Sequence, residues 1–100
     1  MKNDIDQLNK AFESRVRLGI MSILMVSTTV DFLTLKDELQ ITDGNIASHI
    51  NALEKLEYIT INKSFIGKKP NTKYVITKKG KIAFSNHIGA LEKLIKQTKS

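Results

Sequence analysis

The chain has 100 residues, of which 41% are hydrophobic, and it contains no cysteine. This length predicts a single globular domain over residues 1–100, and the lack of cysteine excludes disulfides and thiolate metal sites. The formal net charge of +6 is uneven, because residues 1–57 carry nine acidic and six basic side chains whereas residues 58–100 carry ten lysines and one acid, a distribution that favours a polyanionic partner.

Two helices are predicted before residue 28. Ile5, Leu8 and Phe12 recur at helical spacing and predict a short helix over about residues 4–12. Ser14 is a suitable N-cap for a second helix that runs to about Ser27. Apolar residues surround most of this second helix, so we expect it to be the buried central helix of the fold.

The longest apolar stretch of the chain, Leu18–Val26, lies in this second helix and is interrupted by Ser22. A bilayer span needs about 20 residues, and the acidic N-terminus lacks the basic and then apolar pattern of a signal peptide. We therefore expect a soluble, cytoplasmic protein with no membrane partner.

The next segment predicts a strand followed by two closely joined helices. Thr28–Phe32 is rich in β-branched residues and predicts a short strand. Thr34 with Asp37 three residues later resembles a capping box, so a brief helix is predicted from Thr34 to Leu39. The three-residue connection Gln40–Thr42 leads to the next helix, and two helices joined this tightly are typical of a helix-turn-helix.

A helix over about residues 43–57 has a composition suited to DNA recognition. Thr42 and Asp43 are suitable to cap its start, and one side of it is apolar. The opposite side is small, neutral and polar, which lets a helix enter a major groove and reach base edges. Asp43 is interpreted as a cap, because its charge repels phosphate. The alternative for His49 is packing against Leu56 with a local hydrogen bond. The candidate DNA contacts here are Thr42, Gly44, Asn45, Ser48, His49, Asn51 and Lys55.

Alternating apolar and polar residues from Ile59 onward predict a β-hairpin over residues 59–76, the wing of this DNA-binding unit. Gly67 and Pro70–Asn71 predict a loop of about six residues at its tip. The lysines of the hairpin are candidates for contact with the flanking backbone or the minor groove, or alternatively only keep the loop soluble. They are Lys63, Lys68, Lys69 and Lys73.

Thr77 is a suitable N-cap for a final helix that runs through Ile95. Four apolar residues of this helix, from Phe84 to Ile95, follow one another at +4, +3 and +4, which is the spacing of a helix–helix seam. We therefore expect a homodimer in which the terminal helices meet, although both helices could instead complete the core of their own chain. The candidate interface residues are Ile5, Leu8, Phe12, Phe84, Ile88, Leu91 and Ile95.

The predicted order is helix, helix, strand, helix, helix, strand, strand, helix, a mainly α fold with a small β-hairpin (α+β). This order resembles the single-domain winged helix-turn-helix transcriptional regulators related to the MarR and ArsR groups. The resemblance covers nearly the whole chain and implies a homodimeric, cytoplasmic repressor or activator that binds double-stranded DNA. The segments that carry it are 14–21, 35–39, 42–50, 53–59 and 63–70.

Other classes of function are disfavoured by what the sequence lacks. Metal-sensing relatives in the ArsR group use cysteines or clustered histidines and carboxylates, whereas His49 and His87 lie on different predicted helices, so we expect no metal site and no cofactor. No catalytic triad, phosphate-binding loop or suitable carboxylate pair is present, so an enzyme is not expected. Any small-molecule effector would have to bind between subunits.

Two alternatives stay open at this stage. The chain could be a winged-helix module for protein interaction without DNA binding, although its lysine-rich wing disfavours this, because the cores of protein interfaces are depleted in lysine. Arg15 and Arg17 could either steady the start of the second helix or touch the phosphate backbone.

Overall fold

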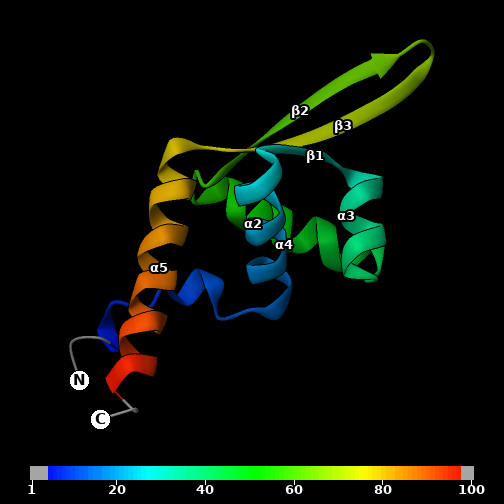
Figure 1. Cartoon of the computed structure of the whole chain (residues 1–100). Coiled ribbons are helices and arrows are strands. Elements are labelled where there is room, and N and C mark those ends of the chain that lie inside the picture. Colours follow the sequence, from blue (N-terminus) through cyan, green and yellow to red (C-terminus); the bar gives the residue numbers. More distant parts are fainter. Residues whose placement is uncertain (1–4, 98–100) are drawn as a thin grey trace.

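The computed structural model describes residues 5–97 (Figure 1). Its helices and strands follow the predicted order, and the mainly helical α+β fold with a hairpin is confirmed. The elements are η1 (Lys10–Phe12), α2 (Arg15–Ser27), β1 (Thr29–Asp31), α3 (Phe32–Leu39), α4 (Asp43–Lys55), β2 (Ile59–Ile66), β3 (Lys69–Ile76) and α5 (Lys78–Gln97).

The segment before α2 is less regular than the predicted helix over residues 4–12. Residues 5–6 are helical, and η1 is a single 3-10 turn. Between them Asn9 has extended backbone (φ −92°, ψ 119°), and its side-chain oxygen accepts a hydrogen bond from the N–H of Ala11 at 2.9 Å. An Asn side chain that bonds to nearby backbone in this way competes with helix, which accounts for the interruption.

The helix starts show which predicted caps form. Ser14 Oγ accepts a hydrogen bond from the N–H of Arg17 at 3.3 Å, so α2 begins where expected. The start predicted for α3 at Thr34 is wrong, because the cap is Asp31, whose Oδ1 accepts from the N–H of Thr34 at 2.8 Å. This bond lowers the pKa of Asp31. The helix consequently begins at Phe32, and Thr34 lies in its first turn.

The three strands form one antiparallel sheet in the order β1-β3-β2. The hairpin register runs without a break to the pair Ile66–Lys69, so its turn is only Gly67 (φ +65°) and Lys68. The predicted loop of about six residues is therefore wrong, since Pro70 lies in β3 opposite Phe65. β1 does not reach this far along β3, so the missing N–H of Pro70 costs no sheet hydrogen bond. The wing is a long ribbon that projects from the body (Figure 1).

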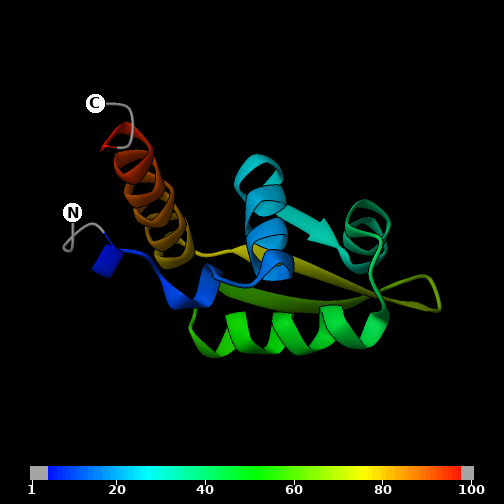
Figure 2. The ribbon, with the colours of Figure 1, turned by 90° about the horizontal axis from the view of Figure 1, so that it is seen from below.

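The core lies around α2, which Figure 2 places between α5 and α3, while α4 packs directly against α2 and β2. The prediction that α2 is central is confirmed, although its far side is open and Val26 is 88% exposed. None of the helices in residues 5–97 is long and apolar enough to cross a bilayer. The fully buried large side chains are Ile20, Met21, Leu24, Leu35, Ile46, Leu53 and Ile59.

Candidate nucleic-acid interface

α4 has two sharply different sides. Ile46, Ile50 and Leu53 are buried in the core with exposures of 2% or less. Leu56, which helical spacing groups with these three residues, follows the last helical residue and is 39% exposed. His49 lies at the edge between the two sides and is half-buried. The exposed candidates are Thr42, Gly44, Asn45, Ser48, Asn51 and Lys55.

The start of α4 is held by a cap and an ion pair. Thr42 Oγ1 accepts a hydrogen bond from the N–H of Asn45 at 3.3 Å, as expected for an N-cap. Asp43 pairs with Lys36 of α3 at 2.8 Å, and this partner raises the pKa of the lysine. A Cβ atom at Gly44 would meet nothing within 4 Å, so packing within the protein does not require glycine there. Gly44 thus leaves the backbone open on the solvent side of α4.

His49 and Arg17 are brought together by the packing of α2 on α4. Arg17 Nε donates a hydrogen bond to His49 Nδ1 at 2.9 Å. Burial, and secondarily the charge of Arg17, lower the pKa of His49, so its imidazole is neutral at pH 7 and can accept this bond. The contact differs from the local hydrogen bond considered from sequence. It joins residues 32 positions apart, so no local pattern could have revealed it.

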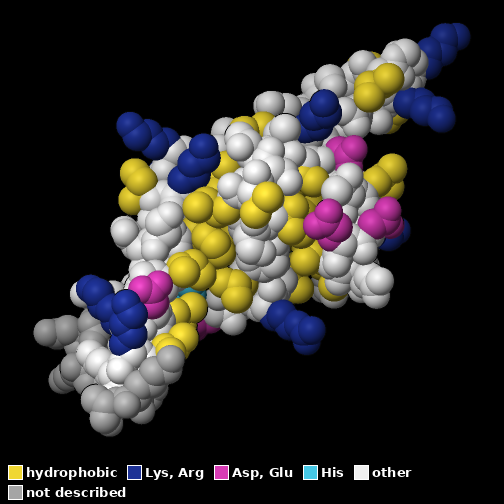
Figure 3. Space-filling view, in the orientation of Figure 1, with side chains coloured by type: hydrophobic (Ala, Val, Ile, Leu, Met, Phe, Trp, Pro, Cys, Tyr) yellow, Lys and Arg dark blue, Asp and Glu magenta, His cyan; other side chains and the backbone are white. Residues whose placement is uncertain are grey.

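The wing carries both charge and exposed apolar surface. All four candidate lysines are exposed, and Figure 3 shows Lys and Arg side chains around the tip of the hairpin. Within residues 5–97, Lys63, Lys68 and Lys69 form no ion pair. Phe65 and Ile66 next to the turn are 73% and 67% exposed. Both residues lie in the predicted wing segment 63–70, but no pattern in the sequence singles them out as candidate contacts.

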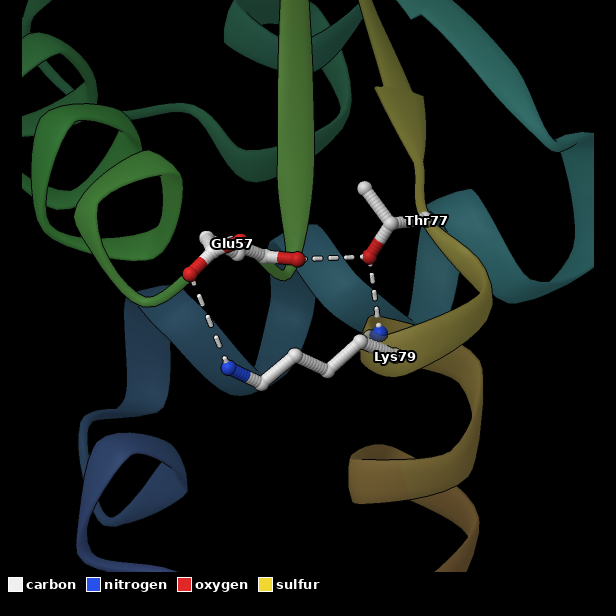
Figure 4. Close-up of polar contacts among 4 residues, drawn as sticks. Glu57, Thr77 and Lys79 are labelled. Atoms are coloured by element: carbon white, nitrogen blue, oxygen red, sulfur yellow. Dashed lines mark hydrogen bonds and ion pairs between the residues drawn. The ribbon is translucent and has the colours of Figure 1, made fainter.

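The end of α4 is tied directly to the start of α5 (Figure 4). Thr77 donates its hydroxyl hydrogen to the carbonyl oxygen of Glu57 at 2.7 Å, and its Oγ1 accepts from the N–H of Gly80 at 2.9 Å. Lys79 Nζ lies 4.0 Å from Glu57 Oε1, an exposed pair of little energetic weight. Thr77 is therefore both the predicted cap of α5 and a link to Glu57, two residues beyond the end of α4.

The structure divides the candidate dimer residues into two groups. Phe12 and Phe84 pack edge-to-face within the chain, with ring centroids 5.4 Å apart, and are only 2% and 6% exposed. They therefore belong to the core of the chain itself. Helical spacing is the same for a core face and for a dimer seam, so it could not separate the two. Ile5, Ile88 and Ile95 are 54%, 41% and 57% exposed, whereas Leu8 and Leu91 are half-buried. Figure 3 shows hydrophobic side chains gathered on the face formed by α2 and α5.

A small polar cluster fastens Asn9 to His87 of α5 and to Tyr58. The backbone N–H of Asn9 donates to His87 Nδ1 at 3.0 Å, and the Asn9 side-chain amide donates to Tyr58 Oη at 3.0 Å. His87 is 4% exposed, and burial lowers its pKa, opposed by the nearby Glu13 carboxylate. Within residues 5–97, no three His, Cys, Asp or Glu side chains are grouped as metal ligands would be.

Comparison with known proteins places these features in a family context. The family model for a winged helix DNA-binding domain matches residues 16–95. The uncharacterized protein MJ0432 of Methanocaldococcus jannaschii is 37% identical over 87 residues, which cover 87% of this chain and 95% of that protein. A solved transcriptional regulator homologue from Pyrococcus horikoshii OT3 superposes with a TM-score of 0.89 at 27% identity, covering 98% of this chain and 99% of that chain.

Two further solved structures share the fold at lower identity. NadR in complex with 4-hydroxyphenylacetate has a TM-score of 0.72 at 17% identity, covering 99% of this chain and 70% of that chain. YusO from Bacillus subtilis has a TM-score of 0.74 at 11% identity, covering 97% of this chain and 71% of that chain. Identities this low indicate a common fold and nothing about ligands.

Proposed function

Since the chain belongs to the winged helix DNA-binding domain family, we propose that it is a sequence-specific regulator of transcription that binds double-stranded DNA. The family and the similarity to a transcriptional regulator homologue point to a regulator and not to an enzyme. The observation that carries the proposal is the contrast between the two sides of α4. One side is buried in the core, and the other offers small, neutral, polar side chains to solvent.

In this proposal α4 lies in the major groove. Asn45, Ser48 and Asn51 are exposed and have the hydrogen-bonding groups that read base edges, with Asn suited to adenine and Ser to either base type. Gly44 allows the helix backbone to approach closely. The wing lysines contact phosphates of the flanking DNA or the minor groove, which supplies affinity that does not depend on sequence.

We further propose that two copies act together as a homodimer. Ile5, Ile88 and Ile95 provide exposed apolar surface on the terminal segments, and Leu8 and Leu91 lie beside them half-buried. Single winged helices contact a short stretch of DNA, whereas a symmetric dimer links two recognition helices and raises the affinity for paired half-sites. The two half-sites would form an inverted repeat because the subunits are related by a two-fold axis.

Selection of bound duplexes from a random DNA library, with the full-length protein, tests the proposal. We expect an enriched inverted repeat whose half-site centres are about 10 bp, or a multiple of that, apart. The affinity for the selected duplex should fall steeply as salt rises, since phosphate contacts release counterions. No enrichment, together with no binding to any duplex at low salt, would contradict the proposal. That result would instead favour a winged-helix module for protein interaction.

A further inference from the structure

Arg17 lies outside the helix-turn-helix, yet its charged group lies against α4. It belongs to the first turn of α2, and its Nε donates to His49 Nδ1 at 2.9 Å. His49 and the exposed Asn45 are one helical turn apart on α4. The guanidinium of Arg17 is therefore fixed beside the edge of the side that we propose reads bases.

The remaining donors of this guanidinium are free and reach solvent. A guanidinium has five N–H donors, one on Nε and four on the two Nη atoms. Among residues 5–97, the side chain of Arg17 makes no hydrogen bond or ion pair besides the one to His49. In the same residues no buried side-chain nitrogen or oxygen lacks a partner. The two Nη atoms are consequently accessible from outside the protein.

His49 is suited to hold the guanidinium rather than to repel it. Burial is the main cause that lowers the pKa of His49, and Arg17 is the charged neighbour that lowers it further. Neither α3 nor β2 contributes a charged group that shifts this pKa. With Nδ1 accepting from Arg17, the imidazole carries its proton on Nε2. Because Nε2 has no partner in the described part of the chain, it also faces solvent.

We propose that Arg17 binds a phosphate of the DNA backbone at the edge of the major groove, with its guanidinium positioned by His49. The inference rests on the proposed function and extends the interface from α4 and the wing to α2. Paired Nη donors match the oxygens of a phosphate bidentately. Holding Nε in advance reduces the side-chain entropy lost on binding. His49 is accordingly a positioning residue in this proposal, not a reader of base sequence.

Arg15 provides a matched control for Arg17. It lies on the same turn of α2 and carries the same charge, but it lines a groove with Gly19, Phe84 and Ile88, and the hydrogen bond to His49 comes from Arg17. Arg15→Gln and Arg17→Gln therefore remove equal charge from nearly the same place. A difference between the two variants reports the position of the guanidinium and not the net charge of the protein.

The first experiment measures the affinity of the full-length protein for the selected duplex over a range of salt concentrations. Arg17→Gln should lower the affinity about tenfold and reduce the salt slope by about one unit, with a smaller effect for Arg15→Gln. His49→Ala should lower the affinity about threefold, and His49→Gln, whose amide oxygen can accept from Nε, should restore most of it. In the Arg17→Gln background, His49→Ala should cause no further loss.

The second experiment locates the phosphate. Duplexes that each carry one neutral methylphosphonate linkage should identify a position that weakens binding by the wild-type protein and not by Arg17→Gln. If both proteins respond alike at every position, or if Arg17→Gln binds as the wild type does, the inference is overturned while the proposed function stands. A shift in base preference on His49→Ala would overturn the positioning role. A wild-type protein that binds no duplex would overturn the proposed function and the inference together.

Discussion

Gly80 and Tyr58 lie so close together that a Cβ atom at position 80 would overlap the carbonyl oxygen of Tyr58. The same carbonyl oxygen accepts a hydrogen bond from the N–H of Thr77 at 3.0 Å. The first turn of α5 is therefore pressed against the turn that follows α4. Glycine is required at position 80 by this close approach of two backbones.

Gly80→Ala should lower the free energy of unfolding by about 1–3 kcal/mol, because the backbone of α5 or of residue 58 has to shift. Gly89→Ala is the matched control on the same helix, since a Cβ there would meet nothing within 4 Å. The control should raise stability by about 0.5–1 kcal/mol through helix propensity. Urea denaturation of the two variants measures both effects. Equal changes in the two would mean that the close approach does not constrain the fold.

Ser48→Ala and the pair Lys68→Ala with Lys69→Ala should have different effects on DNA binding. Loss of the Ser48 hydroxyl should reduce discrimination between the selected duplex and random DNA by about 1–3 kcal/mol. Loss of the two lysines should weaken all duplexes alike and flatten the salt slope by about one unit for each phosphate contact removed. Titrations against both duplexes at several salt concentrations make the comparison. Unchanged discrimination in Ser48→Ala would remove this residue from the recognition surface.

Gly44→Ala should have opposite effects on the stability of the protein and on its affinity for DNA. Since a methyl group at this position meets no protein atom, alanine should stabilise α4 by about 0.5–1 kcal/mol. On DNA the same methyl group should reduce affinity, because it holds the helix backbone away from the groove. Thermal unfolding and DNA titration are measured on the same preparation. Higher stability with unaltered affinity would show that Gly44 does not approach DNA.

Ile88→Ser and Ile95→Ser together should convert the proposed dimer into a monomer. Both side chains are exposed on one side of α5, where the loss of apolar contact would weaken the seam. Ile82→Ser is the control, because Ile82 is similarly exposed, at 54%, on another side of the same helix. Sedimentation velocity at micromolar concentration reports the association state. A wild-type protein that sediments as a monomer would refute the dimer, and dissociation by Ile82→Ser would place the seam elsewhere.

His87 should make the stability of the fold depend on pH. Its pKa in the folded protein is lowered from 6.5, mainly by burial, so the unfolded chain binds more protons between the two pKa values. The contribution of neutral His87 to the free energy of unfolding is therefore fully present above about pH 6.5 and is lost as the pH falls toward the pKa of the folded state. His49, whose pKa is also lowered, contributes with the same sign.

The contribution of His87 is isolated by comparing His49→Gln with His49→Gln/His87→Gln. Denaturant unfolding is measured at a series of pH values from 7 to about 5. The free energy of unfolding should fall less steeply with decreasing pH in the double variant, whatever its value at pH 7. Parallel curves for the two proteins would mean that burial of His87 does not couple folding to protonation.

The sequence predicted those parts of the fold that local chemistry determines. Ser14 and Thr77 were recognised as caps because a cap needs only one side chain and the next three residues. Turn chemistry predicts Pro70 in the loop, whereas it pairs with Phe65 of β2 at a point of β3 that β1 does not reach. Whether a proline falls in a turn or beside an unpaired edge depends on a strand some 40 residues earlier in the chain, which no local pattern contains.

In the candidate interface too, features that depend on local sequence could be predicted and features that depend on packing between distant segments could not. The exposed polar side of α4 could be predicted from helical periodicity, and the structure leaves those residues open. Phe84 was grouped with Ile88 by spacing, but the packing of Phe12 against it places it in the core. The contact between Arg17 and His49 depends on how α2 crosses α4, so it could be seen only once the fold was known.

The hydrogen bonds of Thr77 shown in Figure 4 affect how α4 and α5 can move relative to each other. The Thr77 hydroxyl bonds both to Glu57, two residues beyond α4, and to the first turn of α5, so the two helix ends are held directly together. In a dimer joined along α5, the α4 helix of each subunit would therefore rotate as one body with the α5 helix of the same subunit. A small change in the angle between the two α5 helices would then change the distance between the recognition helices. Such a lever would allow an event at the subunit seam to select operators by their half-site spacing.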